Sequence, residues 1–328
     1  MTFSLNPEAD GWGICSARPE DAAVTVAVTG GTGFIGRAVI RQFIKCGVQV
    51  RALFRPRSGS TPPSAPGLTW IPGDLLHIPS LEHLIRDADA VVNCAGAITG
   101  VHSGHFVPAN VEGVKRLVSV ISHSKHRPRL LHVSSLAARM PEISPYAGSK
   151  RLGEDLISRQ DALEWTIIRP PAVYGPGDRA LRPLFECMRR GLLLAPGTGE
   201  GRFSLIFVED LARAIVFWFK GVDLSGRCFE LHDGRPGGYS WKDVGETASR
   251  ILGRPVLRVR IPPGFLRMLA GMNTLAASMT GMSPILTAGK ARELCHEDWV
   301  CCPGHGGEMG GWMPAVDLEQ GLRRVFGL

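Results

Sequence analysis

The chain has 328 residues, of which 44% are hydrophobic and 20% charged, so it is long enough to bury a sizeable core as an ordinary globular protein. The formal net charge is +7, but there is no basic run and no basic motif interleaved with aromatic residues, which argues against nucleic acid as a partner. No apolar run is long enough to cross a bilayer, and residues 1–22 lack the basic start and apolar core of a secretory signal. The eight cysteines show no paired C-x-x-C spacing, which is typical of reduced thiols, and we therefore expect a cytoplasmic protein.

After a loose arm at residues 1–22, the sequence predicts a strand, a glycine turn and a helix. Residues 24–28 are apolar and rich in β-branched side chains, as in a buried parallel strand. The turn T-G-G-T-G-F-I-G follows at residues 29–36, and residues 37–46 have the apolar spacing of a helix packed on a sheet. A glycine motif between a strand and a helix is typical of dinucleotide binding, although such a turn can also be purely structural.

Each glycine of this turn has a physical use. Gly30 permits the tight turn, Gly33 lets the backbone approach a pyrophosphate, and Gly36 allows the helix to pack closely on the strand. The N-terminus of the following helix offers free N–H groups and partial positive charge to phosphates. The spacing is G-x-x-G-x-x-G and differs from the commoner G-x-G-x-x-G.

The end of the second predicted strand, residues 48–54, bears on the cofactor. An acidic residue there commonly binds the ribose 2′-hydroxyl of NAD, whereas arginine accommodates the 2′-phosphate of NADP. This strand ends without an acid and is followed by Arg55, and Arg37 lies just past the glycine turn. We therefore predict NADP, with NAD as the alternative; exposed arginines without a role remain a further interpretation. After a third strand at residues 68–71, the sequence Gly73-Asp74-Leu75 would place a carboxylate near the adenine.

Two more strands are predicted before the proposed chemistry. Residues 90–94 form the fourth, and small residues such as Ala95 and Gly96 follow it where a cofactor must pass closely. Residues 97–109 read as a loop at the ligand side of the sheet, in which His102 and His105 either touch substrate or have no role. A helix is expected at residues 110–120, and a fifth strand at residues 130–133 ends at Ser134-Ser135.

Tyr146 and Lys150 are four residues apart and share one face of a predicted helix. A tyrosine hydroxyl titrates near ~10 when unperturbed, which is too high for proton transfer at neutral pH. A nearby ammonium favours phenolate, so we expect Lys150 to lower the pKa of Tyr146. Ser135, at a strand end, can hydrogen-bond the same substrate oxygen. The pair alone is commonplace, but its place after a glycine turn and a serine-terminated strand indicates a catalytic set.

An ordered series of motifs resembles an extended short-chain dehydrogenase/reductase of the NAD-dependent epimerase/dehydratase family. The matching residues are Thr29-Gly30-x-x-Gly33-Phe34-Ile35-Gly36, Asp74-Leu75, Asn93-x-Ala95-Gly96, Asn110-Val111-x-Gly113, Ser134-Ser135, Tyr146-x-x-x-Lys150, the run R-P-P-A-V-Y-G-P-G-D at residues 169–178, and Gly311-Trp312-x-Pro314 with Leu318-x-x-Gly321-Leu322. The resemblance covers about residues 24–328 and implies a nicotinamide cofactor with a Ser135-Tyr146-Lys150 catalytic set. It further implies that Lys150 binds the nicotinamide ribose and that Asn110 supports this lysine through the hydrogen-bond network.

The resemblance also implies which residues bind the cofactor. They are Gly30, Thr32, Gly33, Phe34, Ile35, Gly36, Arg37, Arg55, Asp74, Leu75, Asn93, Ala95, Gly96, Lys150 and Pro170. Two departures stand out. Phe207 occupies a position where many relatives carry histidine, and Arg55 resembles the NADPH-using reductases related to dihydroflavonol reductase more than the sugar epimerases that retain NAD.

The implied fold is α/β, a Rossmann-type doubly wound parallel sheet with a smaller C-terminal α/β substrate region. We expect the NAD(P)-binding domain at residues 23–175 and the substrate-binding region at residues 176–328, of which residues 203–232 return to the first domain. The methionine-rich segment 261–288 suits core or lid packing, an apolar pocket wall or contact with a membrane surface. The Cys and His residues at 295–305 lack the paired ligand spacing of a zinc site, so no metal is predicted.

The predicted reaction is reversible hydride transfer between NADP(H) and a carbonyl or alcohol of a small-molecule substrate. Two alternatives stay open: a nucleotide-sugar epimerase or dehydratase with tightly bound NAD, and a non-catalytic dinucleotide-binding protein like the accessory subunit of respiratory complex I. The intact Ser135, Tyr146 and Lys150 argue against the last of these. Relatives often dimerise through paired helices, so a homodimer is possible. The sequence does not identify the substrate.

Overall fold

The structure of the protein is a computed structural model, and it describes residues 24–56, 62–221, 223–280, 286–302 and 309–328. The predicted N-terminal arm therefore lies outside the described residues. Within them, no helix is long and apolar enough to cross a membrane.

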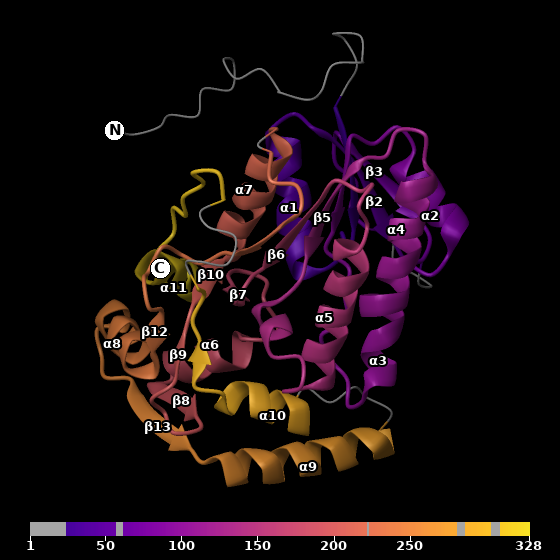
Figure 1. Cartoon of the computed structure of the whole chain (residues 1–328). Coiled ribbons are helices and arrows are strands. Elements are labelled where there is room, and N and C mark those ends of the chain that lie inside the picture. Colours follow the sequence, from indigo (N-terminus) through magenta and orange to yellow (C-terminus); the bar gives the residue numbers. More distant parts are fainter. Residues whose placement is uncertain (1–23, 57–61, 222, 281–285, 303–308) are drawn as a thin grey trace.

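Seven parallel strands form the central sheet, in the order β11-β6-β5-β4-β1-β2-β3 (Figure 1). These strands are β1 (Thr25–Thr29), β2 (Gln49–Phe54), β3 (Leu68–Pro72), β4 (Ala90–Asn93), β5 (Arg129–Val133), β6 (Trp165–Arg169) and β11 (Arg227–Glu230). Because β1 lies inside the sheet with later strands on both sides, the chain winds outward in two directions. The predicted doubly wound parallel sheet is confirmed.

Helices cover both faces of this sheet, as the continuous burial of β1 from Val26 to Thr29 requires. The covering helices are α1 (Phe34–Lys45), α2 (Ile78–Ile85), α4 (Gly113–His123), α5 (Pro145–Ser158) and α7 (Val208–Phe219). Val26 and Val28 point into the core formed with α1 and α7, whereas Ala27 points into the core formed with α2, α4 and α5. The rings of Phe43 and Phe219 meet edge to face at 5.1 Å, so α7 packs on the first helix of the chain.

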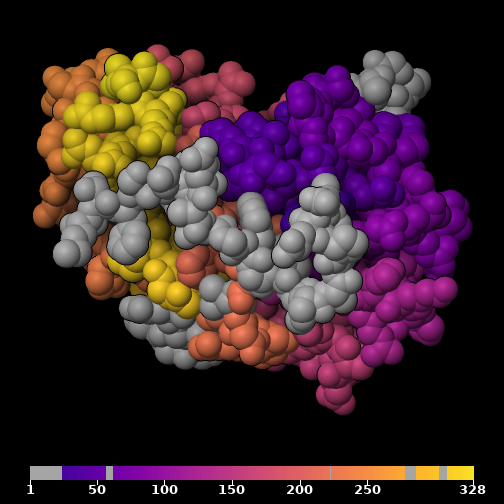
Figure 2. Space-filling view, turned by 90° about the horizontal axis from the view of Figure 1, so that it is seen from above, coloured from indigo at the N-terminus to yellow at the C-terminus, as the bar shows by residue number. Residues whose placement is uncertain are grey.

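The remaining elements build a smaller region beside the carboxyl ends of the strands (Figure 1). They are β7 (Ala172–Tyr174), α6 (Arg182–Arg189), β8 (Leu192–Pro196), β9 (Arg202–Phe203), β10 (Leu205–Phe207), β12 (Tyr239–Ser240), α8 (Trp241–Leu252), β13 (Leu257–Ile261), α9 (Pro263–Thr280), α10 (Ala288–Cys295), β14 (Asp298–Trp299) and α11 (Leu318–Phe326). A second apolar core, centred on Tyr174, Phe207 and Leu322, joins α6, α8 and α11. From above, the C-terminal α11 (yellow) lies beside α8 (orange), next to the indigo first βα unit (Figure 2).

Two stretches that the sequence indicated as irregular are regular in the structure. The expected loop at residues 97–109 contains the short helix α3 (Ser103–Val107) and the start of a π-helical turn, η1 (Pro108–Glu112), which continues into α4. The sequence L-L-A-P-G-T-G-E-G at residues 193–201 predicts a turn before a strand at 203–208, but it begins within strand β8, which pairs in parallel with β13. Both predictions were wrong because the partners that order these stretches lie elsewhere in the chain.

Candidate active site

The glycine turn lies against the end of β4. Gly30 has a φ of +68°, and a Cβ atom there would lie 2.6 Å from the backbone nitrogen of Ala95. A Cβ atom on Gly36 would collide with the carbonyl oxygen of Gly30. The tight turn predicted at Gly30 and the close packing predicted at Gly36 are therefore present, and neither position accepts a side chain.

The N-terminus of α1 fits a pyrophosphate group. Gly33 is its N-cap residue, no side chain caps the helix, and its first turn contains no acidic residue. Thr32, Gly33 and Arg37 are exposed beside these N–H groups. Phe34 and Ile35 are half-buried where the helix begins. A 12-residue helix with unshared N-terminal N–H groups offers partial positive charge to an anion.

The predicted adenosine side of the site has one charged pair. Arg55 and Asp74 lie at the carboxyl ends of β2 and β3 with 4.0 Å between Nε and Oδ2, and both side chains are substantially exposed. Leu75 is different, because its side chain is buried against the Cα of Gly113. Pro170 is also buried, and its carbonyl oxygen accepts a hydrogen bond from the backbone of Leu136. Leu75 and Pro170 thus position backbone, and their side chains face protein.

A buried polar network joins the ends of β1, β4 and β5. The hydroxyl of Thr29 donates to Oδ1 of Asn93, and Nδ2 of Asn93 lies 2.9 Å from Nδ1 of His132. Burial and the charge of Lys150 hold the pKa of His132 well below its ordinary value, so this imidazole is neutral. The Asn93 side chain is fully buried in the network, which leaves only the backbone that follows it, at Ala95 and Gly96, open to a ligand.

Ser135 and Tyr146 lie together at the carboxyl end of β5. Ser135 caps the short helix η2 (Leu136–Arg139), and Ser144 caps α5, which carries Tyr146 in its first turn. Burial raises the pKa of Tyr146 to about 12, a hydrogen bond with Ser135 lowers it, and the charge of Glu293 raises it. The expectation that Lys150 brings this pKa towards neutrality is not met, since desolvation dominates. Tyr146 is therefore a neutral phenol that can donate a proton.

Lys150 lies one turn further along α5, with its ammonium buried. Its Nζ donates a 2.9 Å hydrogen bond to the carbonyl of Val133, at the last residue of β5. Burial lowers the pKa of Lys150 to about 8, while the charges of Glu154 and Cys94 raise it. A Cβ atom on Gly96 would lie 3.7 Å from Nζ, so the lysine faces the backbone that follows β4.

Asn110 ties this backbone to the catalytic helix. It lies in the π-helical turn η1, where its Nδ2 donates to Oγ of Ser149 at 2.9 Å and to the carbonyl of Ala97 at 3.0 Å. Its Oδ1 accepts from the backbone of Ala97 at 2.8 Å. Asn110 therefore fixes the segment after β4 against α5 through Ser149, next to Lys150.

The sequence predicted no role for three charged residues next to this set: Glu154, Arg169 and Glu293. Glu154 follows Lys150 by one turn, is buried, and accepts two hydrogen bonds from Arg169 at 2.9 and 2.6 Å. Glu293 of α10 accepts from the hydroxyl of Ser144 and pairs with Lys290. The four-residue spacing of Lys150 and Glu154 on one helix could have indicated Glu154. Glu293 could not be found this way, because it contacts Ser144 from 149 residues further along the chain.

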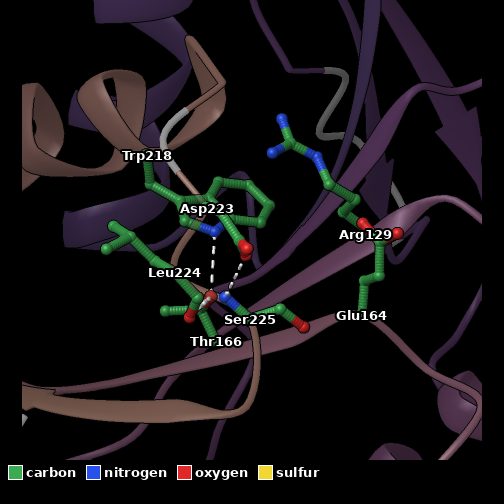
Figure 3. Close-up of a pocket in the computed structure, with 7 residues that line it drawn as sticks. All are labelled: Arg129, Glu164, Thr166, Trp218, Asp223, Leu224 and Ser225. Atoms are coloured by element: carbon green, nitrogen blue, oxygen red, sulfur yellow. Dashed lines mark hydrogen bonds between the residues drawn. The ribbon is translucent and has the colours of Figure 1, made fainter. Parts of the chain in front are cut away.

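Helix α3 packs on α5, and the rings of Phe106 and Tyr146 lie 5.9 Å apart between centroids. His102 and His105 are exposed at the start of α3, with ring centroids 4.0 Å apart. Of the 295–305 cluster, Cys301 is buried, Cys302 is exposed and His305 lies outside the described residues. A small cavity of about 20 Å³ lies at the opposite edge, near the amino ends of β5 and β6, where Trp218 donates to Thr166 (Figure 3). That edge is remote from the carboxyl ends of the strands, so this cavity is not the catalytic site.

Comparison with known proteins settles the family. The model of the "NAD dependent epimerase/dehydratase family" matches residues 26–227, which is more than half of the chain. The protein belongs to this family. It is thus an NAD(P)-dependent member of the extended short-chain dehydrogenases/reductases, a group of reductases and epimerases, and the predicted resemblance is confirmed.

Several relatives resemble the chain over most of its length. It is 34% identical over 286 residues to a ceramide reductase of Caulobacter vibrioides, covering 85% of this chain and 87% of that protein. It is 26% identical to a 2-alkyl-3-oxoalkanoate reductase of Stenotrophomonas maltophilia, covering 92% and 98%. It is 25% identical to the mitochondrial 40 kDa subunit of NADH-ubiquinone oxidoreductase of Neurospora crassa, covering 84% and 72%. A human epimerase family protein solved with NADPH has the same fold, with a TM-score of 0.71, 18% identity and coverage of 93% and 100%.

Proposed function

We propose that this family member is an NADP(H)-dependent reductase that transfers hydride reversibly between the cofactor and a carbonyl or alcohol. The observation that carries the proposal is the meeting of Ser135, Tyr146 and Lys150 at the carboxyl end of β5. The glycine turn and the open N-terminus of α1 lie at the same edge of the sheet. Proton donor and phosphate site thus share the side on which such sheets bind ligands.

In this mechanism the bound cofactor supplies the hydride and the protein supplies the proton. The hydroxyl of Ser135 holds the substrate oxygen, and Tyr146 gives its phenolic proton to that oxygen as the carbonyl becomes an alcohol. Tyr146 suits this step because its raised pKa keeps it protonated at neutral pH. Lys150, which faces Gly96, would hold the ribose of the bound cofactor and would offset the charge that develops on Tyr146.

NADP is the proposed cofactor because Arg55 lies at the carboxyl end of β2. Its side chain is 68% exposed, so the guanidinium is free to turn towards a 2′-phosphate. Asp74 lies 4.0 Å away, and a pair this long between exposed side chains is too weak to fix the guanidinium.

The proposed substrate is a ketone that carries long apolar chains. Two relatives are named for ceramide and for 2-alkyl-3-oxoalkanoates, both of which combine a polar reacting group with alkyl chains. A second candidate function is dinucleotide binding without turnover. It is suggested by the relative that is a subunit of NADH-ubiquinone oxidoreductase. A third, suggested by the family description, is epimerisation or dehydration without net use of cofactor.

Tyr146→Phe tests the proposal. With a 2-alkyl-3-oxoalkanoate as probe, we expect NADPH oxidation to fall by about 10²–10⁴-fold because the phenolic proton is gone. Binding of NADPH, followed by its fluorescence, should change little. Tyr174→Phe is the matched control, since Tyr174 is buried in the second apolar core and donates a long 3.4 Å hydrogen bond to the backbone carbonyl of Asp317. Normal turnover in Tyr146→Phe would refute the mechanism, and wild-type binding of NADPH without turnover of any carbonyl would favour the non-catalytic alternative.

A further inference from the structure

The positive charge of the protein is concentrated in one segment. Between residues 247 and 292 the sequence has seven basic residues and no acidic one. The seven are Arg250, Arg254, Arg258, Arg260, Arg267, Lys290 and Arg292. Outside the segment, 30 basic residues (37 less 7) balance 30 acidic ones, so this stretch accounts for the whole net charge of +7.

The same segment exposes an apolar stripe on α9. Phe265, Met268, Met272 and Leu275 are 48%, 52%, 61% and 65% exposed. Their spacing of three, four and three residues places them on one face of the helix. On the opposite face, Leu266 and Ala270 are buried against Ala291 of α10. The exposed stripe is thus additional to the face that α9 needs for folding.

Strand β13, which precedes α9, is exposed on both faces, one apolar and the other basic. In β13, Leu257 and Val259 are 64% and 37% exposed, and they alternate with the exposed Arg258 and Arg260. Arg258 lies 3.9 Å from Glu200, whereas Arg260 makes no ion pair with any other described residue. In Figure 1, β13 and α9 run along the lower boundary of the molecule, outside α10.

The basic charge continues into a cavity at the inner side of α9. This cavity, of about 220 Å³, is lined by Arg267 of α9 and by Arg292 and His296 of the α10 segment. Arg292 donates from Nε to the carbonyl of Ile143, close to the start of α5. Cationic groups therefore flank the apolar stripe along its inner side as well as at β13.

We propose that α9 and β13 dock on the surface of an anionic lipid membrane. An amphipathic helix that exposes bulky apolar residues beside Arg and Lys suits the boundary between headgroups and acyl chains. Carboxylates outside the segment pair with Arg250, Arg258 and Lys290. Arg260, Arg267 and Arg292 make no ion pair with another described residue, so their charges are available to anionic headgroups. A second copy of this chain fits the same face less well, because it would bring two segments of like charge together.

This surface adjoins the proposed catalytic set. Gly289 of α10 is packed on Ser144 and Pro145, directly before Tyr146, and α10 lies between α9 and α5. Docking through α9 would therefore turn the carboxyl edge of the sheet towards the membrane. Such an orientation suits a substrate with long apolar chains, but the docking itself does not rest on the proposed reaction.

Vesicle binding by the full chain tests the proposal. Wild-type protein should sediment with vesicles of phosphatidylcholine and phosphatidylglycerol, bind pure phosphatidylcholine far less, and lose binding as salt is raised. Met268→Glu with Met272→Glu should weaken binding to the mixed vesicles by about tenfold or more, because two charges would enter the apolar boundary. Met313→Glu is the matched control, since Met313 is 72% exposed and lies outside the 247–292 segment.

Each outcome decides the proposal. Failure of the wild-type protein to bind anionic vesicles overturns it, as does equal binding by the double variant and by Met313→Glu. A wild-type dimer that the double variant converts to monomer, without vesicle binding, would assign the face to a second copy. If the double variant unfolds, the salt and lipid dependence of the wild-type protein still decides. Tyr146→Phe should bind vesicles normally, so a failure of the proposed reaction is separable from a failure of docking.

Discussion

The catalytic edge of the sheet buries polar side chains, whereas the α9–β13 face exposes apolar ones. At the catalytic edge, polar and charged side chains such as Lys150, Glu154 and Asn110 are buried, and each contacts a partner. On the α9–β13 face, apolar side chains such as Met268 and Met272 are exposed. Burying charge and exposing apolar area both cost free energy, so neither arrangement is explained by stability alone. The contrast indicates that function is concentrated in these two regions.

Buried charges form a chain from the catalytic edge to the residues that follow α10. Glu154 pairs with Arg169, whose Nη1 lies 3.8 Å from Glu230, and Glu230 lies 3.6 Å from Arg139. Arg139, the last residue of η2, also donates to the carbonyl of Asp298 in β14 and to that of Val300 just after this strand. The network thus fastens the C-terminal region to the loop that carries Ser135.

The largest effect is expected from breaking this chain at Glu154. Glu154→Ala leaves the buried Arg169 without its bidentate partner and should lower the free energy of unfolding by about 3–5 kcal/mol. Asp155→Ala, at the next residue of α5, removes an exposed pair with Arg151 and should cost about 0–1 kcal/mol. Urea unfolding followed by circular dichroism measures both. Equal losses in the two variants would show that burial does not set the strength of these pairs.

Lys150→Met should separate stability from function at the catalytic edge. Burial lowers the pKa of Lys150 from 10.5 to about 8, so the folded protein binds this proton less tightly than the unfolded chain. Its charge is therefore a penalty at pH 7, and the variant should gain roughly 1–3 kcal/mol of stability, less what the carbonyl of Val133 loses as an acceptor. Turnover should nevertheless be lost.

The pH dependence of stability is the control for the prediction on Lys150→Met. The stability of the wild-type protein should rise relative to the variant as pH increases from about 8 to 10.5, because the unfolded chain alone holds the proton there. Thermal unfolding across this range measures the difference. A constant gap between the two proteins, or a less stable variant at pH 7, would contradict the burial of a charged lysine.

The parts of the fold and site that the sequence predicted are those fixed by local geometry. A glycine at φ +68° and the shared face of Tyr146 and Lys150 depend on a few consecutive residues, and both were readable in the order of the motifs. The side chains of Asn93 and Leu75 illustrate the limit. Both residues match the motifs in position. The motifs do not predict that the side chain of Asn93 is buried at the strand ends and that of Leu75 against α4.

What could not be predicted depends on partners distant in the chain. Strand β8 forms because Leu192 to Pro196 pairs with β13, more than sixty residues later. The raised pKa of Tyr146 depends on burial and on Glu293, which reaches it from α10. The α9 stripe was readable as methionines at helical spacing, but only the structure distinguishes its exposed face from the face on α10.

The smallest effect is expected at Arg55, and it decides the cofactor at the catalytic edge. Arg55→Ala should weaken NADPH binding by about tenfold, the loss of one exposed charge-assisted contact with a 2′-phosphate, and leave NADH binding nearly unchanged. Arg41→Ala, an exposed arginine on α1 away from the strand ends, is the matched control for lost positive charge. Titration of nucleotide fluorescence measures all three proteins. If Arg55→Ala weakens NADH equally, Arg55 acts through Asp74 on the shape of the strand ends, and the proposed selection of NADP by Arg55 is refuted.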